Sequence, residues 1–229
     1  MAKKRKTTQK QTKAVKATRY TKHIPNPEEP TPAWELLKEP YEYNEKHSLR
    51  KTILVVCQSK EEAAYFKSFP IASLTVVPPR EEEATPLDTV LYAQEIVKAT
   101  AHDFDQVWCV CRTSPEQANS LEAAAKKAHS LGYHIVYSND SFDLWIWLHY
   151  GEMQENYQQA LGETLQIDPE KGKDLLFYKR LYNQLEEDPR AQRSLAIERA
   201  KKLYLAQEKL PYASQSPLTN LYELVENLL

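Results

Sequence analysis

The sequence predicts an α/β fold in which a parallel sheet is flanked by helices. Four short apolar segments of strand type recur between residues 51 and 139. Each is followed by a segment with helical periodicity, and several of these begin with a capping residue. The joints are short, which favours right-handed crossovers and a sheet covered on both faces. After residue 151 the patterns are helical only, so we expect an all-helical C-terminal part packed on the sheet.

The first unit begins with KTILVVC, residues 51–57, a continuous apolar and β-branched run typical of strands buried on both faces. The next segment, 59–69, has Ser59 at the N-cap and Glu62 at the third helical position. This spacing predicts a capping box, in which the two side chains satisfy each other's backbone N–H groups. Glu62 therefore has a sufficient structural role as a helix cap.

A second strand is expected in SLTVVPP, residues 73–79, because two prolines close a β-branched run. The helix that follows spans 85–101. Thr85 is its N-cap, Pro86 its first residue and Asp88 its third.

FDQVWCVC, residues 104–111, is the third strand, and we expect its helix to start at Ser114 as N-cap and to end at Gly132. YHIVYS, 133–138, is the fourth strand. The segment SFDLWIWLHY, 141–150, is apolar nearly all round, which predicts a buried helix.

Beyond Gly151 helices are expected at 152–165, 174–186, 189–208 and 217–229, the last with Ser216 as N-cap. Their narrow apolar stripes favour packing on the sheet. The expected organisation is a basic disordered tail at 1–22, a proline-rich linker at 23–50, an α/β domain at 51–150 and a helical subdomain at 151–229.

The N-terminal 22 residues carry no acid, and their basic side chains are Lys3, Lys4, Arg5, Lys6, Lys10, Lys13, Lys16, Arg19 and Lys22. The whole chain has a net charge of −2, so the remaining residues, with 21 basic and 32 acidic side chains, carry −11. The tail is a candidate nucleic-acid-binding arm, since clustered Lys and Arg release counterions from phosphates. A solubilising tail, or one that folds back on the acidic body, is the alternative.

Several protein classes are excluded by what the sequence lacks. No apolar run approaches the length of a membrane span. The four glycines, at 132, 151, 162 and 172, do not follow strands of the sheet, which excludes a P-loop and a dinucleotide fingerprint. Three cysteines, Cys57, Cys109 and Cys111, fit a reducing cytoplasm, and core packing is favoured over a metal or redox centre.

In a parallel sheet the ligand site lies at the carboxyl ends of the strands. The polar residues expected there are Gln58, Ser59, Glu61, Glu62, Arg112, Thr113, Ser114, Asn139, Asp140 and Asp143. His149 lies six residues after Asp143, so the two are not an i, i+4 ligand pair on the helix, and a structural role is favoured for the histidine.

Roughly residues 50–229 resemble the RloB-like family of prokaryotic defence-associated proteins. The passages that carry the resemblance are VVCQSKEEAAYF, FDQVWCVCRTS, YHIVYSNDSFDLWIWLHY, LLFYKRLY and SPLTNLYELVENLL. The most specific is SNDSFDLWIWLHY, which places Asn139, Asp143, Trp145 and His149 in the family's pattern. Tyr178 with Lys179, and Pro217 with Thr219, match shorter elements more loosely.

The resemblance implies a Toprim-like sheet and Mg²⁺-dependent phosphodiester chemistry, with a Glu after the first strand and an Asp-x-Asp pair after the third. Here those positions hold Gln58, Arg112 and Ser114, and of the acids in the first motif only the last, Glu62, is retained. Gln58 cannot shuttle a proton, and Arg112 would repel Mg²⁺. We therefore expect a degenerate centre with no metal and no cofactor. Its vestigial positions are Gln58, Glu62, Arg112, Ser114, Asn139, Asp143 and His149.

Three functions are compatible with these observations. The first is a non-catalytic or reduced-activity component of a defence module that binds nucleic acid or a partner, and the resemblance implies an AAA-type ATPase as that partner. The second is a Mg-dependent nuclease with a rearranged centre of Glu61, Glu62, Asp140 and Asp143. The third is a housekeeping nucleic-acid binder acting through the basic tail. The first is favoured. Arg112 is expected to form an ion pair with Glu62, Asp140 or, best, Asp143, and the alternative is that its side chain points to solvent.

Overall fold

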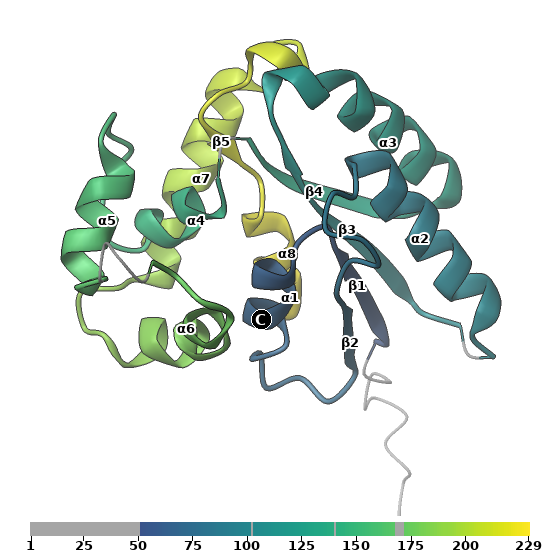
Figure 1. Cartoon of the computed structure of the whole chain (residues 1–229), viewed down its shortest axis with the longest axis horizontal. Helices are drawn as coiled ribbons and strands as arrows, with labels where there is room; N and C mark the ends of the chain where they lie inside the picture. The colour runs from purple at the N-terminus through teal and green to yellow at the C-terminus, as the bar shows by residue number, and fades with distance from the viewer. Residues whose placement is uncertain (1–50, 102, 140, 168–171) are drawn as a thin grey trace, which may run out of the picture. The chain divides into compact units, whose positions relative to one another are not determined.

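The computed structural model describes residues 51–101, 103–139, 141–167 and 172–229, all of which belong to one compact unit, His47–Leu229. The expected tail at 1–22 and the expected linker at 23–50 both lie outside the described residues. Within the described part, five strands form one sheet in the order β2-β1-β3-β4-β5. Helices lie on both faces of this sheet (Figure 1). The prediction of an α/β fold with a helical C-terminal part is confirmed.

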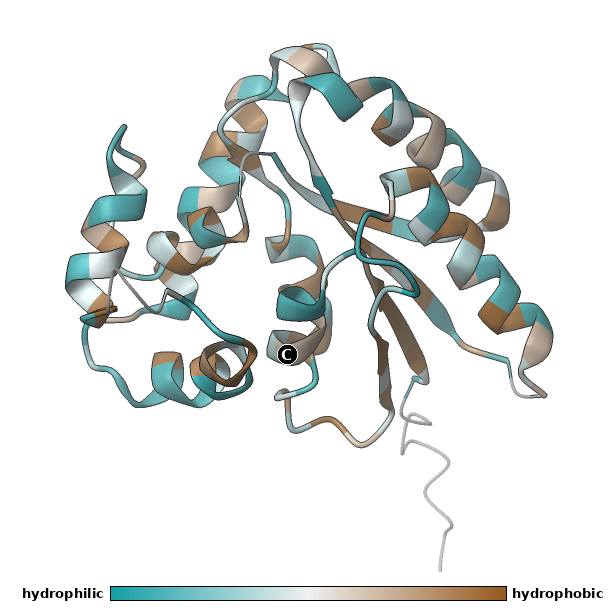
Figure 2. Ribbon diagram, in the orientation of Figure 1, coloured by the Kyte–Doolittle hydropathy of each residue, from teal (hydrophilic) through white to brown (hydrophobic). Residues whose placement is uncertain are grey.

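The first four strands are β1 (Ile53–Cys57), β2 (Leu74–Val77), β3 (Gln106–Thr113) and β4 (His134–Asn139), and their pairings are all parallel. All five residues of β1 are buried, as expected for a strand covered on both faces. The hydrophobic character of these central strands is visible in Figure 2.

One face of the sheet is covered by α2 (Pro86–Ala99) and α3 (Ala118–Leu131). Thr85 caps α2 in a complete capping box with Asp88, as predicted. The expected Ser114 cap is wrong, because a 3-10 turn, Pro115–Gln117, precedes α3 and the Ser114 carbonyl accepts from the N–H of Gln117 at 2.9 Å. Gly132 ends α3 in the left-handed conformation with φ of 71°, as predicted.

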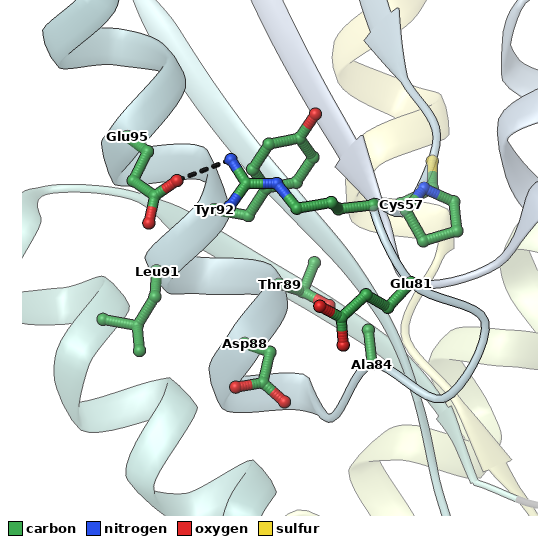
Figure 3. A pocket seen from close by; sticks show the side chains of 10 residues that line it. Cys57, Glu81, Ala84, Asp88, Thr89, Leu91, Tyr92 and Glu95 are labelled. Atoms are coloured by element: carbon green, nitrogen blue, oxygen red, sulfur yellow. Dashed lines mark hydrogen bonds and ion pairs between the residues drawn. The ribbon is translucent and has the colours of Figure 1, made fainter.

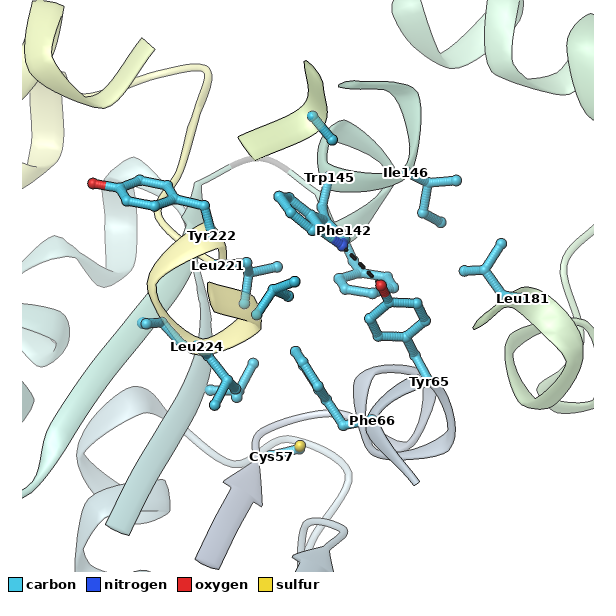
Figure 4. Packing of buried hydrophobic residues seen from close by; sticks show 14 of the residues in the cluster. Cys57, Tyr65, Phe66, Phe142, Trp145, Ile146, Leu181, Leu221, Tyr222 and Leu224 are labelled. Carbon is cyan, nitrogen blue, oxygen red and sulfur yellow. Dashed lines mark hydrogen bonds between the residues drawn. The ribbon is translucent and has the colours of Figure 1, made fainter. Parts of the chain in front are cut away.

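The opposite face carries α1 (Lys60–Phe66), α4 (Phe142–Leu148) and the C-terminal helices. These are α5 (Tyr157–Leu165), α6 (Leu175–Glu187), α7 (Arg193–Gln207) and α8 (Tyr222–Leu228). At the centre of this layer Trp145 is fully buried and donates a hydrogen bond to the Tyr65 hydroxyl at 3.2 Å (Figure 4). Because α4 is buried on nearly all sides, its apolar sequence is explained by packing alone.

The helix predicted at 217–229 is wrong in its first half. The Ser216–Pro217 peptide is cis, and a 3-10 turn, Tyr212–Ser214, comes shortly before it. Leu218–Thr219 then form β5, which pairs antiparallel with the end of β4. The sheet is therefore mixed at one edge. As a strand, this segment finds buried backbone partners, which it would lack if it formed an exposed turn of helix.

Candidate functional site at the carboxyl edge of the sheet

The predicted site residues follow the ends of parallel strands, so the fold gathers them along one edge. Gln58 comes directly after β1, and its N–H donates to the Val110 carbonyl of β3 at 2.8 Å. Arg112 is the next-to-last residue of β3, and it is in register with Ser138 of β4. The structure thus brings Gln58 and Arg112 together, as the sequence predicted.

Gln58 is a structural connector between three segments. Its Nε2 donates to the Ala84 carbonyl at 2.7 Å, and its Oε1 accepts from the Arg112 N–H at 2.8 Å. The side chain is buried, so both bonds form away from water. An ionised glutamate in this place has no donor for the Ala84 carbonyl. The amide therefore fits the local hydrogen bonding and has no proton to transfer.

Glu62 is fully buried, and its environment differs from the predicted one. Ser59 caps α1 by accepting from the Glu62 N–H at 3.2 Å, but the reciprocal bond of a capping box is absent. Neither carboxylate oxygen of Glu62 has a hydrogen-bond partner of normal geometry. Burial raises the pKa of Glu62 to about 7, while the charge of Arg112 and polar contacts with Ser59 limit that rise. The helix-capping explanation of this acid is therefore insufficient.

The expected ion pair of Arg112 with Glu62 or Asp143 is wrong. Within the described part of the chain, Arg112 is exposed and has no carboxylate oxygen within 4.0 Å, and Asp140 lies outside that part. Asp143 instead pairs with Lys173, which comes just before α6. Both partners of this pair are mostly shielded from solvent, with side-chain exposures of 14% for Asp143 and 21% for Lys173. A lysine in a loop beyond 150 satisfies the aspartate that sequence reasoning assigned to Arg112.

Tyr178, from the C-terminal helical layer, also lies near the charged residues of this edge. It lies on α6, which packs against α1, and it is buried. Its pKa is raised well above the usual value, first by burial and then by the negative charges of Asp143, Glu61 and Glu62, whereas Arg112 opposes the rise. Sequence reasoning missed Lys173 and Tyr178 as site residues. The resemblance of LLFYKRLY to the family was the only signal for the tyrosine, and nothing marked the lysine.

Asn139 holds the C-terminal segment against the sheet. It is buried, and its Nδ2 donates to the Gln215 carbonyl, while its Oδ1 has no partner among the described residues. Next to it the hydroxyl groups of Ser138 and Thr219 are hydrogen-bonded at 2.9 Å. The Pro-x-Thr element, Pro217 to Thr219, therefore has a structural role, because its Thr219 pairs β5 with β4.

His149 is a buried structural residue. Its Nδ1 is 3.0 Å from the Trp145 carbonyl, and its ring meets the Trp145 ring edge-on at 5.0 Å. Burial is the main reason that its pKa falls to about 4, and the charges of Arg193 and Arg199 add to the effect. The imidazole is therefore neutral at pH 7, which favours the predicted structural role.

The three cysteines are free and buried. Cys109 and Cys111 lie on the face covered by α2 and α3, and Cys57 lies on the opposite face. Burial raises the pKa of Cys109 to about 12 and those of the other two well above the usual value. Neutral thiols in this setting pack as small apolar groups.

The side chains at this edge do not fit a resident Mg²⁺ ion. Across the described residues, no group of three or more His, Cys, Asp and Glu side chains is placed to hold a metal. Asp143 is already paired with Lys173, both polar atoms of the Gln58 side chain are hydrogen-bonded, and Arg112 brings a positive charge to this edge. Mg²⁺ requires several oxygen ligands in near-octahedral geometry, which these residues do not present.

Two pockets of about 260 Å³ lie beside this edge. The first is lined in part by Cys57, Tyr92 and Glu95 (Figure 3). Arg80 crosses it, stacked 4.6 Å from the centre of the Tyr92 ring and paired with Glu95 at 2.7 Å. The second is lined by Gln58, Ser59, Lys60, Glu61, Pro79, Glu82 and Arg112. The second pocket is the one that Gln58 and Arg112 line.

A family model described as RloB-like protein matches residues 53–228, which is nearly all of the described chain. The chain belongs to the RloB-like family. Searches among curated proteins and among solved structures each find no match. No helix in the described part of this RloB-like protein is long and apolar enough to cross a membrane.

Proposed function

We propose that this RloB-like protein is a non-catalytic component of a prokaryotic defence module that binds nucleic acid and acts with an AAA-type ATPase partner. The defence role and the ATPase partner rest on the family resemblance. The absence of metal-dependent cleavage is argued from the residues at the carboxyl edge.

The observation that carries the proposal is that two of the polar groups at this edge, Gln58 and Asp143, already have partners within the protein. The Gln58 amide bridges Ala84 and Arg112, and Lys173 neutralises Asp143. An enzyme that recruits Mg²⁺ keeps carboxylates free to bind it, whereas here the acid at the end of β4 is used internally.

The charge of Arg112 adds a direct electrostatic cost. A divalent cation placed about 4 Å from a guanidinium is repelled by several kcal/mol at an effective dielectric constant of about 20. An ionised carboxylate at the same distance supplies an attraction of about the same size, so Glu62 alone would at most cancel the repulsion and leave no net attraction for the ion.

Nucleic-acid contact is assigned mainly to the nine basic residues of segment 1–22, which precede the described part of the chain. Such an arm neutralises phosphates without reading sequence. The structural unit then serves as the surface for the ATPase partner.

The test is a paired binding and cleavage assay with single-stranded DNA and RNA. The full chain is incubated with labelled oligonucleotide in Mg²⁺, in Mn²⁺ and in EDTA. We expect binding that is unchanged by EDTA and no cleavage in any condition. Metal-dependent cleavage that is lost in Glu62→Ala would contradict the proposal.

A metal-dependent nuclease with a rearranged centre is the second candidate, and one observation favours it. Among the described residues the buried Glu62 carboxyl has no hydrogen-bond partner of normal geometry, and a buried acid of this kind calls for an explanation such as a catalytic role. The same assay separates the two candidates, because only the nuclease requires a divalent ion.

A further inference from the structure

Arg112 and Glu62 form an unusual pair of neighbours. Arg112 is exposed and has no ion-pair partner within the described residues, whereas the buried Glu62 carboxyl meets no donor of normal geometry among them and has only polar contacts with Ser59. The positive charge of Arg112 is close enough to act on Glu62. The site therefore presents an accessible guanidinium beside a buried carboxyl whose charged form is poorly satisfied.

The pocket lined by Arg112 has room for a small anion. Arg112 lines it together with Lys60, whose ammonium pairs with Glu82 at 2.6 Å. The side chains of that pair are 53% and 81% exposed, so the bond is weak and Lys60 can exchange its partner for a ligand. Glu61 and Glu82 also line the pocket, and both acids oppose an anion there.

We propose that this pocket binds a phosphate group without a metal, with the Arg112 guanidinium as its main ligand and Glu62 held in its neutral carboxylic-acid form. The planar guanidinium can donate two parallel hydrogen bonds to phosphate oxygens. This inference deepens the proposed function and rests on it, because it assigns the degenerate centre to phosphate recognition.

The inference predicts that binding takes up a proton. A bound anion neutralises Arg112, which removes the main charge that favours ionised Glu62. The pKa of Glu62, already raised to about 7, then rises further, and the proton comes from solvent. The other groups that face Glu62 are Ser59 and Glu61 beside it, Cys57 of β1, Cys111 of β3 and Tyr178 of α6, and β2 has no titratable side chain.

The first experiment identifies the ligand by calorimetry on the full chain. The probes are inorganic phosphate and two oligonucleotides of one sequence, with a 5′-phosphate or a 5′-hydroxyl. Arg112→Gln should weaken phosphate binding by about tenfold or more, because a charge-assisted bidentate contact is lost. The matched control is Arg80→Gln, which removes an equal charge from the neighbouring pocket and should change affinity by less than about twofold.

The oligonucleotides separate the sources of phosphate. A preference for the 5′-phosphate that disappears in Arg112→Gln assigns the pocket to a nucleic-acid end, and inorganic phosphate binding without that preference assigns it to a free phosphate.

Equal effects of Arg112→Gln and Arg80→Gln, or no binding of either probe, would overturn the inference. Oligonucleotide binding that ignores both the 5′-phosphate and Arg112 leaves the proposed function intact, whereas failure of all oligonucleotides to bind rejects the proposed nucleic-acid contact.

The second experiment tests the role of Glu62 with sulfate, whose charge stays constant near neutral pH. Titration in buffers of different ionisation enthalpy should show uptake of a fraction of a proton by the unaltered chain. Glu62→Gln imitates the neutral acid, so it should bind sulfate as tightly or more tightly and show no uptake. Proton uptake that persists in Glu62→Gln would reject the coupling.

Discussion

At the scale of single residues, Glu62 is where burial and charge conflict most. Its carboxyl is fully buried, and its pKa is raised to about 7 from an ordinary value of 4.5. The folded state therefore binds the proton more tightly than the unfolded chain does. Stability from this group is complete below about pH 4.5 and is lost as pH rises through about 7.

Glu62→Gln should remove this pH dependence. A shift of this size corresponds to roughly 3 kcal/mol, of which we expect about 1–3 kcal/mol in practice. The variant should be more stable than the unaltered chain at pH 8 and about equal to it at pH 4. Urea unfolding at both pH values measures the difference. A variant that loses stability at pH 8 would show that the ionised carboxylate has a partner in solution.

A second prediction concerns Gln58, the residue that connects β1, β3 and the segment at Ala84, and the substitution is Gln58→Glu. The substitution restores the family's acid but removes the donor to the Ala84 carbonyl and places a charge beside Glu62. We expect a loss of about 1–3 kcal/mol at pH 7, the cost of an unsatisfied buried group. Thermal unfolding measures this loss. A variant as stable as the unaltered chain would mean that the hydrogen bonds of the Gln58 side-chain amide contribute nothing to stability.

Part of the candidate site could be predicted from the sequence. The positions Gln58, Glu62 and Arg112 were placed correctly at one edge because parallel strands end together. The partner of Asp143 was not predictable, because Lys173 is 30 residues away and its position depends on how α6 packs. Long-range side-chain pairing has no local sequence signal, which is why the expected pair with Arg112 was wrong.

At the scale of helices and strands, local chemistry predicted some helix ends correctly and missed others, such as the starts expected at Ser114 and Ser216. Thr85 and Gly132 act as caps because their effect needs only the neighbouring backbone. The strand β5 was missed for the opposite reason. Its two residues are fixed by pairing with β4, some 80 residues earlier, and a two-residue strand has no periodicity to detect.

Two glycine substitutions test the packing of the helical layer. A Cβ on Gly151 would lie 2.6 Å from a ring atom of the buried Trp147, whereas a Cβ on Gly162, within α5, meets nothing within 4 Å. Gly151→Ala should destabilise the fold by about 1–3 kcal/mol through overpacking. Gly162→Ala should stabilise it by about 0.5–1 kcal/mol through helix propensity. The denaturant midpoints of unfolding of the two variants measure the difference. Equal changes in midpoint for Gly151→Ala and Gly162→Ala would contradict the described packing of Trp147.

At the scale of the whole molecule, charge is divided unevenly between the first 22 residues and the rest. The tail carries nine positive charges, and the remaining sequence carries −11. If the tail binds phosphates, the slope of log affinity against log salt measures how many it neutralises.

Replacing the nine tail Lys and Arg residues by Gln in the full chain should flatten that slope by several units and weaken oligonucleotide binding by about 10²-fold or more at low salt. The control replaces Lys126 and Lys127 of α3, which are exposed or partly exposed on the folded unit, and should change the slope little. An unchanged slope in the tail variant would show that the folded unit carries the binding.

Calorimetric titration of the full chain with Mn²⁺ and Mg²⁺ tests most directly that the carboxyl edge has lost its metal chemistry. We predict no saturable heat up to about 1 mM metal, because Lys173 already neutralises Asp143 and the Arg112 guanidinium repels a cation. Saturable binding that disappears in Glu62→Ala or Asp143→Ala, but persists in the exposed control Glu95→Ala, would contradict the account.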